Sequence, residues 1–235
     1  MDFRFLTMFP YLPKSPKLVF EDKKKNLGVF EIEGLYRGYG ITLGNALRRV
    51  LLSSLKGAAI TKVKIKNVAH EFSTIEGVME DVVEIILNLK RIRLKLLSEG
   101  PEVLKLKASG IKEVKAKDIE KNPNVEIVNP EHLIARLSSK KAKLEMEMTV
   151  EKGLGYLPVE QQKKEKVPVG TILIDALFSP IKKISFEVED MRVGERTDFN
   201  RLKLVIETDG TISPKEALKK AAQILEEHFQ ILAKD

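Results

Sequence analysis

The side chains most often used for catalysis and metal binding are scarce or scattered in this sequence. It contains no cysteine, which excludes disulfides, thiolate metal ligands and cysteine nucleophiles together. Its histidines, His70, His132 and His228, lie far apart without an i,i+4 partner, so a zinc site would require convergence of distant segments. We therefore expect no metal ion and no other cofactor.

Glycines near residue 40 are the next candidates, because glycine-rich turns before helices can cradle phosphate groups. Gly38, Gly40 and Gly44 give the spacing G-x-G-x-x-x-G, and Leu43 occupies the third glycine position of a dinucleotide-binding turn. No G-K-[ST] sequence follows, as a P-loop would require. The spacing argues against a phosphate site and favours a conformational role, in which glycine permits a tight turn and close helix packing.

Asp175 is the one acidic residue that stands out, because it lies in the apolar run ILIDALFSP. No serine lies in a nucleophile elbow, and no pair of acids is distinguished from the general acidic background. A buried acid needs a partner, and a structural hydrogen bond explains Asp175 more simply than catalysis does. The sequence offers no catalytic constellation, so helices that could bind another protein become the stronger candidates.

The first such helix is predicted from Leu43 to Ser54, with Thr42 as its cap. Its apolar residues have the i, i+3, i+4, i+7, i+8 spacing of one face and are Leu43, Ala46, Leu47, Val50 and Leu51. This face could belong to the protein's own core or dock on a partner, and spacing alone favours the core. Arg48 and Arg49 lie about 100° apart around the axis, with Leu52 beside Arg48, so at least one arginine should face outward. An exposed guanidinium is either solvated or available to a partner's carboxylates.

The last predicted helix has the clearest boundary signals in the sequence. Ser213 can cap it, Pro214 suits the first helical position, and Glu216 completes a capping box. Its apolar residues are Ala217, Leu218, Ala221, Ala222, Ile224, Leu225, Phe229 and Leu232. So wide a face, with alanines that allow close approach, can pack on a sheet and still present surface to another helix.

The middle of the chain is predicted to be rich in strands, because apolar and charged residues alternate in runs such as KVKIK and LEMEMTVEK. One helix is predicted to interrupt them. Ser73 and Glu76 have capping-box spacing, and Lys90 and Arg91 lie near the predicted C-terminal end. The apolar face of this helix is Ile75, Val78, Met79, Val82, Ile86 and Leu89.

The segment 151–170, which is rich in Gly, Pro and Lys, suppresses both periodicities and is predicted to be a surface loop or an interdomain connection. The runs ILIDAL, ISFEVE and LKLVIET then return as strands, the first of them buried.

Composition indicates a globular chain of 235 residues, without a bilayer-spanning apolar run or a signal peptide, and we expect an intracellular protein. Lys and Arg outnumber Asp and Glu by 41 to 34, which gives a net charge of +7. This surplus is compatible with nucleic-acid or acidic protein partners. Because most charges alternate in sign along strands and helices, an ordinary solvated surface is the simpler interpretation.

Four segments together closely resemble the N-terminal domain of the bacterial RNA polymerase alpha subunit. They are GYGITLGNALRRVLLSSLKGAAIT, HEFSTIEGVMEDVVEIILNLK, LFSPIKKISFEVEDMRVGERTDFNRL and ETDGTISPKEALKKAAQILEEHF. The resemblance implies an α+β fold with two domains. Residues 1–57 and 175–235 would form a dimerisation domain with an antiparallel sheet and two helices, and residues 58–174 an inserted, sheet-rich α+β domain.

The resemblance also implies roles for individual residues in a homodimer that assembles the beta and beta-prime subunits and contributes no catalytic residue. For dimerisation these are Leu43, Ala46, Leu47, Val50, Leu51, Leu218, Ala221, Ala222, Leu225, Phe229 and Leu232. For binding the beta subunit they are Arg48, Arg49 and Leu52. For binding the beta-prime subunit they are Lys90, Ile174, Asp175, Ser179, Pro180 and Ile181, and Arg192–Asp198 should border these surfaces.

Two departures from the family limit what is carried over. The loop QQKKEKVPVG is basic where some relatives are acidic, so an activator contact there is not assumed. The chain ends at Asp235, where family members continue into a linker and a small DNA-binding domain, so we expect no direct DNA binding. The expected location is the cytoplasm, with the nucleoid reached through the polymerase. A basic nucleic-acid-binding module, with strongly salt-dependent affinity, remains the alternative.

Overall fold

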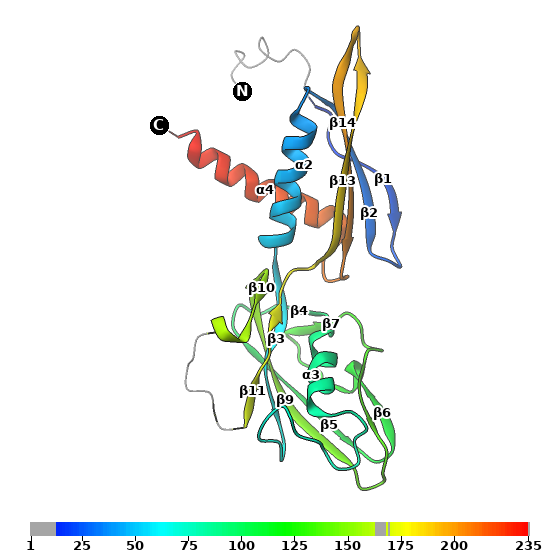
Figure 1. Cartoon of the computed structure of the whole chain (residues 1–235), viewed down its shortest axis with the longest axis vertical. Helices are drawn as coiled ribbons and strands as arrows, with labels where there is room; N and C mark the ends of the chain where they lie inside the picture. Colours follow the sequence, from blue (N-terminus) through cyan, green and yellow to red (C-terminus); the bar gives the residue numbers. More distant parts are fainter. Residues whose placement is uncertain (1–12, 163–167, 169, 235) are drawn as a thin grey trace. The chain divides into compact units, whose positions relative to one another are not determined.

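The computed structural model describes residues 13–162, 168 and 170–234. The chain forms two compact units, both visible in Figure 1. The discontinuous unit runs up to Leu55 and resumes at Pro180, and the continuous unit is Lys56–Ser179. Helices combine with mostly antiparallel sheets, which confirms the predicted α+β class. No helix among the described residues is long and apolar enough to span a membrane.

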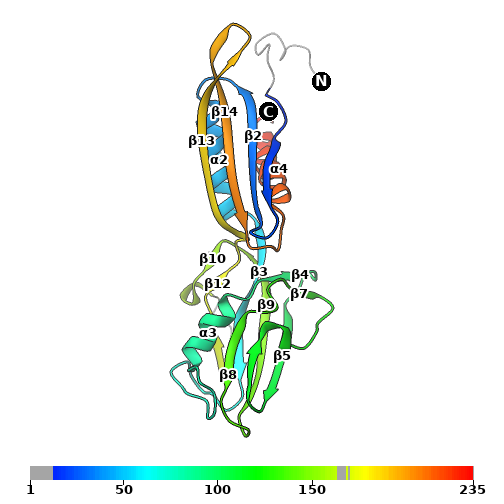
Figure 2. The same ribbon diagram turned by 90° about the vertical axis from the view of Figure 1, so that its right-hand side faces the viewer.

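The discontinuous unit consists of an antiparallel four-stranded sheet with two helices on one face, as Figure 2 shows. In sheet order its strands are β1 (Lys17–Asp22), β2 (Leu27–Leu35), β14 (Arg196–Thr208) and β13 (Ile181–Val193). The helices are α2 (Tyr39–Ser53) and α4 (Pro214–Leu232). Alternation along β14 buries Leu202, Leu204 and Ile206 beneath the helices, as period two requires.

Helix α2 begins earlier than the sequence predicts, because its first turn depends on a distant side chain. Gly38 is the N-cap residue and has a left-handed backbone with φ of 86°. Its N–H donates to Asn200 Oδ1 at 2.9 Å. The predicted cap at Thr42 is therefore wrong, and the Thr42 hydroxyl instead donates to the Gly38 carbonyl at 3.2 Å. Glycine fits the cap because other residues rarely adopt a positive φ.

Gly44 lets α2 approach the sheet closely. A Cβ placed on Gly44 would lie 2.6 Å from a ring carbon of Phe186, which belongs to β13. The expected packing role of this glycine is therefore confirmed.

Gly44→Val is expected to destabilise the discontinuous unit by about 1–3 kcal/mol, because the new side chain would overpack the contact with Phe186. Urea denaturation followed by circular dichroism measures the change. Gly100→Val is the matched control, since a Cβ at Gly100 meets no atom within 4 Å. Equal stability of the two variants would contradict the packing.

Helix α4 begins where the sequence predicts. Ser213 Oγ accepts a hydrogen bond from the Glu216 N–H at 3.2 Å, and Pro214 is the first helical residue. These signals are local, so they could be interpreted without knowledge of the fold.

The continuous unit contains a six-stranded sheet, two small two-stranded sheets and helix α3 (Val82–Lys90). In the large sheet, β5 (Glu102–Ser109), β9 (Lys143–Leu154), β3 (Lys56–Ile65), β4 (Leu94–Leu96) and β7 (Val125–Ile127) are neighbours in that order, and β11 (Thr171–Leu173) also pairs with β3. The small sheets pair β6 (Lys112–Lys115) with β8 (Leu133–Leu137), and β10 (Tyr156–Leu157) with β12 (Ala176–Leu177). Two short 3-10 helices are η1 (Ala116–Asp118) and η2 (Val159–Gln161).

The predicted start of α3 at Ser73 is wrong, although its predicted end at Lys90 is confirmed. The helix begins at Val82, and Asp81 caps it by accepting from the Glu84 N–H at 2.7 Å. Gly77 has a φ of 78°, which interrupts any helix that continues from Ser73. The preceding loop is held to β8, because the carboxylate of Glu80 accepts from the Arg136 N–H at 2.6 Å.

The chain after residue 170 forms two short strands where its apolar pattern predicts one. The run ILIDAL, predicted as one strand, is split between β11 and β12, with Ile174 and Asp175 between them. The predicted loop after Glu151 begins later, because β9 continues to Leu154. Its basic part, residues 163–166, lies outside the described residues.

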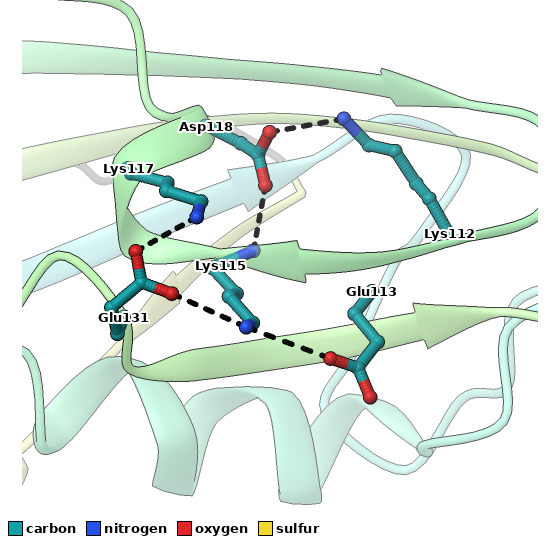
Figure 3. Close-up of polar contacts among 6 residues, drawn as sticks. All are labelled: Lys112, Glu113, Lys115, Lys117, Asp118 and Glu131. Atoms are coloured by element: carbon teal, nitrogen blue, oxygen red, sulfur yellow. Dashed lines mark hydrogen bonds and ion pairs between the residues drawn. The ribbon is translucent and has the colours of Figure 1, made fainter.

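A cluster of charged residues joins β6, η1 and the turn before β8, as Figure 3 shows. Glu131 pairs with Lys117 at 2.7 Å and with Lys115 at 3.3 Å. Asp118 accepts from the Lys115 N–H at 2.8 Å and from Lys112 Nζ at 3.1 Å. The hydrogen bond from Lys117, followed by that from Lys115, lowers the pKa of Glu131.

Glu131→Gln is expected to lower stability at pH 7 but not in strong acid. Because its folded pKa lies below the unfolded value of about 4.3, the Glu131 carboxylate stabilises the fold above that value. This contribution is lost as the pH falls through the lowered folded pKa. Urea titrations at pH 7 and pH 3 measure the change, with Glu126→Gln as an exposed control outside the cluster. If Glu131→Gln lowered the free energy of unfolding equally at pH 7 and pH 3, the stabilising role of the ionised Glu131 carboxylate would be contradicted.

Candidate protein-docking surfaces

The predicted apolar face of α2 is divided between the core and the surface. Leu47 and Leu51 are buried in the core of the discontinuous unit. Leu43, Ala46 and Val50 are only partly buried. On this helix the exposed apolar side chains include Ile41, which the sequence analysis did not single out, and Leu52. The buried side chains of this face therefore pack within the discontinuous unit. The partly buried and exposed side chains beside them are available to contact another protein.

Helix α4 shows the same division along its length. Leu218 and Ala221 are buried, whereas Ala222 is exposed and Leu225 is partly buried. Phe229 and Leu232 are 60% and 81% exposed, and Ile231, which was not predicted, is 68% exposed. In Figure 1 this C-terminal half of α4 continues past α2, away from the sheet. Three large apolar side chains thus lie on a stretch of helix that the unit's own sheet does not cover.

Arg48, Arg49 and Leu52 are all exposed on α2. Neither guanidinium forms an ion pair with another residue in the described part of the chain. The Arg49 carbonyl accepts from the Ser53 hydroxyl at 2.8 Å, which holds the last turn. Helical geometry required only one of the two arginines to face outward, but both are exposed. Each guanidinium is therefore free to pair with a partner's carboxylates.

Asp175 has structural partners, as expected for a half-buried acid. Its Oδ2 accepts from Lys90 Nζ at 2.7 Å, and its Oδ1 accepts from the Val159 N–H at 3.0 Å. The hydrogen bond from Lys90, followed by that from Val159, lowers the pKa of the carboxyl group. Lys90 and Asp175, which the resemblance places on one binding surface, are therefore directly joined.

The other residues carried over for the same surface are mostly buried. Ile174 lies in the core of the continuous unit and Ile181 in that of the discontinuous unit. Ser179 and Pro180 are also buried. The exposed apolar side chains of the continuous unit include Leu154, Tyr156 and Leu177. Sequence reasoning missed them, because the pairing of Tyr156 with Leu177 depends on a ribbon that two separate segments form.

The stretch Arg192–Asp198, predicted to border these surfaces, contains the end of β13, the two-residue turn that follows and the start of β14. Within it, Arg196 and Asp198 make an exposed ion pair of 2.8 Å.

The basic character of the continuous unit does not form an unpaired patch on the outer side of its large sheet. A hollow of about 330 Å³ is lined there by Lys64, Lys66, Lys105, Leu106, Lys107, Glu145, Met146 and Glu147. Lys66 pairs with Glu145 at 3.0 Å and Lys105 with Glu147 at 3.5 Å. Acidic residues of β9 thus pair with two of these four lysines, and a third, Lys107, pairs with Glu120 at 3.6 Å, which favours a solvated face over a nucleic-acid site.

Comparison with known proteins gives one family match and many similar chains. The family described as RNA polymerase Rpb3/RpoA insert domain matches residues 63–179, which lie within the continuous unit. A protein of Roseiflexus castenholzii is 53% identical over 218 residues, which are 93% of this chain and 67% of the relative. Relatives from Carboxydothermus hydrogenoformans and Moorella thermoacetica are 50% and 51% identical, with 93% of this chain and 69% of each relative covered. All three are named DNA-directed RNA polymerase subunit alpha.

Proposed function

The chain belongs to the family of bacterial DNA-directed RNA polymerase alpha subunits, and from this membership we propose that it is a non-catalytic assembly scaffold. In this role it forms a homodimer through the discontinuous unit. The dimer captures the beta subunit and then the beta-prime subunit, and the catalytic residues belong to those partners. No direct contact with DNA is proposed for the residues of this chain.

Dimerisation is supported by the exposed C-terminal half of α4. Phe229, Ile231 and Leu232 form an apolar stretch that is not covered by the unit's own sheet. Burying such side chains stabilises an interface by about 1.5–3 kcal/mol each before the costs of association. The remaining surface candidates are Leu43, Ala46, Val50, Ala222 and Leu225. Leu47, Leu51, Leu218 and Ala221 support the interface from within the protomer's core.

The beta subunit is proposed to bind near the C-terminal end of α2. Arg49 is the leading contact, because its exposed guanidinium can bind a carboxylate with two parallel hydrogen bonds. Arg48 and Leu52 flank it on the same helix and extend the surface.

The beta-prime subunit is proposed to bind the part of the continuous unit around Lys90 and Asp175, where the chain continues into Pro180 and Ile181. Ile174 and Ser179 are buried in the continuous unit, and Pro180 and Ile181 are buried in the discontinuous unit, so Lys90 and Asp175 are the more exposed of the residues proposed for this surface.

A two-fold dimer presents each of these surfaces twice. We propose that one protomer uses its α2 surface for beta and the other uses its Lys90–Asp175 surface for beta-prime. Identical chains thereby occupy two different environments in one asymmetric complex.

The observation that carries the proposal is the uncovered apolar half of α4, and the first test is the state of the chain in solution. Light scattering at micromolar concentration is expected to give the mass of a dimer, which should then retain beta, and beta-prime only after beta, in sequential capture. A monomer, or a dimer that retains neither large subunit, would overturn the proposal.

A further inference from the structure

The carboxylate of Asp175 joins two elements that are distant in the sequence. Its Oδ2 is bound by Lys90, the last residue of α3, and its Oδ1 by the N–H of Val159, the first residue of η2. The side chains of Lys90 and Asp175 are only 30% and 28% exposed. Their polar atoms are therefore occupied by contacts within the continuous unit.

The β10–β12 ribbon, which includes the residue after Asp175, depends on hydrogen bonds from outside its own strand pairing. The β10–β12 ribbon has only two residue pairs, Tyr156 with Leu177 and Leu157 with Ala176. So short an antiparallel pair is not stable by itself. Further hydrogen bonds hold it. Gln162 Nε2 donates to the Ile174 carbonyl at 2.6 Å, and the Gly155 carbonyl accepts from the Phe178 N–H at 2.8 Å and from the Ser179 N–H at 3.2 Å.

Tyr156 and Leu177 are exposed apolar side chains of this ribbon, and Leu154, the last residue of β9, lies just before it in the chain. Leu154, Tyr156 and Leu177 are 52%, 59% and 46% exposed, and Tyr156 also donates a side-chain hydrogen bond that lowers the pKa of Asp175. Tyrosine is among the side chains that contribute most at protein interfaces, and neighbouring apolar side chains exclude water around it, whereas an exposed ion pair contributes little.

We propose that Lys90 and Asp175 are a positioning pair, which holds the β10–β12 ribbon and η2 in place so that the beta-prime subunit docks on Leu154, Tyr156 and Leu177. The two charged residues bind each other and Val159, and they act on the partner through the ribbon. This inference rests on the proposed function, since it concerns the surface assigned there to beta-prime.

Hydrogen exchange in the free, full chain tests the positioning role without any partner. Lys90→Met and Asp175→Asn are each expected to raise the exchange rate of amides in 155–162 and 176–178 by about tenfold. Lys117→Met is the matched control, because it removes another ion pair of 2.7 Å from the same unit. Unchanged exchange in both variants at the ribbon would overturn the inference.

Capture of beta-prime by the dimer, after beta has bound, tests whether the pair acts through the ribbon. Each single variant should weaken capture by about tenfold, and the double variant by no more than either one, because the two residues form one contact. Leu177→Ser should weaken capture to a similar extent without changing exchange in 155–162. Losses that add in the double variant, or weak capture by Lys90→Met with wild-type exchange, would show direct contact and contradict the proposal.

The two proposals fail in different ways. If the wild-type dimer captured no beta-prime, the proposed function would fail, but the exchange rates would still decide whether Lys90 and Asp175 position the ribbon. If the wild-type dimer captured beta-prime and Leu177→Ser did so equally well, the ribbon would be excluded as the docking surface while the scaffold function would stand.

Discussion

The double variant Phe229→Glu, Leu232→Glu is expected to be a folded monomer at concentrations where the wild-type chain is a dimer. Both side chains are largely exposed on the half of α4 that extends beyond the sheet, so their replacement leaves the unit's own core intact. Two-fold symmetry makes each substitution act twice, and it also brings four carboxylates into one apolar interface. After the costs of association, we expect the dimer dissociation constant to rise by about a thousandfold or more.

Sedimentation equilibrium or light scattering over a dilution series measures this change, and circular dichroism reports whether the helices remain. Ile111→Glu is the matched control, because Ile111 is 64% exposed but belongs to the continuous unit. It should leave the dimer unchanged. A double variant that remains dimeric would remove the C-terminal half of α4 from the interface, and a dimer disrupted by the control would mean that the continuous unit takes part.

Arg49→Ala is expected to abolish capture of the beta subunit at nanomolar to micromolar concentrations while the dimer persists. A guanidinium that pairs with a partner's carboxylate contributes about 2–5 kcal/mol when truncated in a desolvated interface, which corresponds to a loss of affinity of about 30-fold or more. Arg49 is exposed and makes no ion pair within the described residues, so its removal should not affect folding.

Co-purification and interferometry with the beta subunit measure the effect of this substitution. Arg48→Ala is informative because its side chain lies about 100° away around the same helix, and we expect a smaller loss. Arg37→Ala is the control, since it removes an exposed arginine ahead of the N-terminal end of α2. Full retention of beta by Arg49→Ala would exclude this arginine as the contact, and an equal loss with Arg37→Ala would indicate a nonspecific effect of charge.

The sequence predicted the ends of helices correctly where the residues that determine them lie close by in the sequence, and incorrectly where those residues are distant. Helix α4 was predicted to the residue, because Ser213 and Pro214 are adjacent in sequence to the turn that they begin. Helix α2 was predicted with the wrong start, because Asn200, which holds the Gly38 N–H, lies 162 residues away. The apolar pattern before α3 fitted a helix, but the positive φ of Gly77 and the contact of Glu80 with β8 turn that segment into a docked loop.

The same distinction explains which surface residues could be inferred from the sequence. Helical periodicity required at least one arginine of α2 to face outward, because it places side chains around an axis that the sequence itself defines. It also put Phe229 on the same apolar face as Leu218, which is buried, so periodicity alone did not show that Phe229 is exposed. Exposure of Tyr156 and Leu177 depends on the pairing of two short segments, so no local pattern marks these residues. The apolar run ILIDAL predicted the burial of Ile172 and Ile174 correctly, but it could not show that the strand would break beside Asp175 and leave Leu177 exposed.

The pairing of β2 with β14 has a consequence for the order of events on the ribosome. Residues of the continuous unit, Lys56–Ser179, have all been synthesised before the first residue of β14 appears, so this unit can fold while the sheet of the other is still half made. Gly38, at the start of α2, has to wait for Asn200, and α4 emerges only after β14 is complete. A prematurely terminated chain would therefore lack the helix on which the proposed dimer depends.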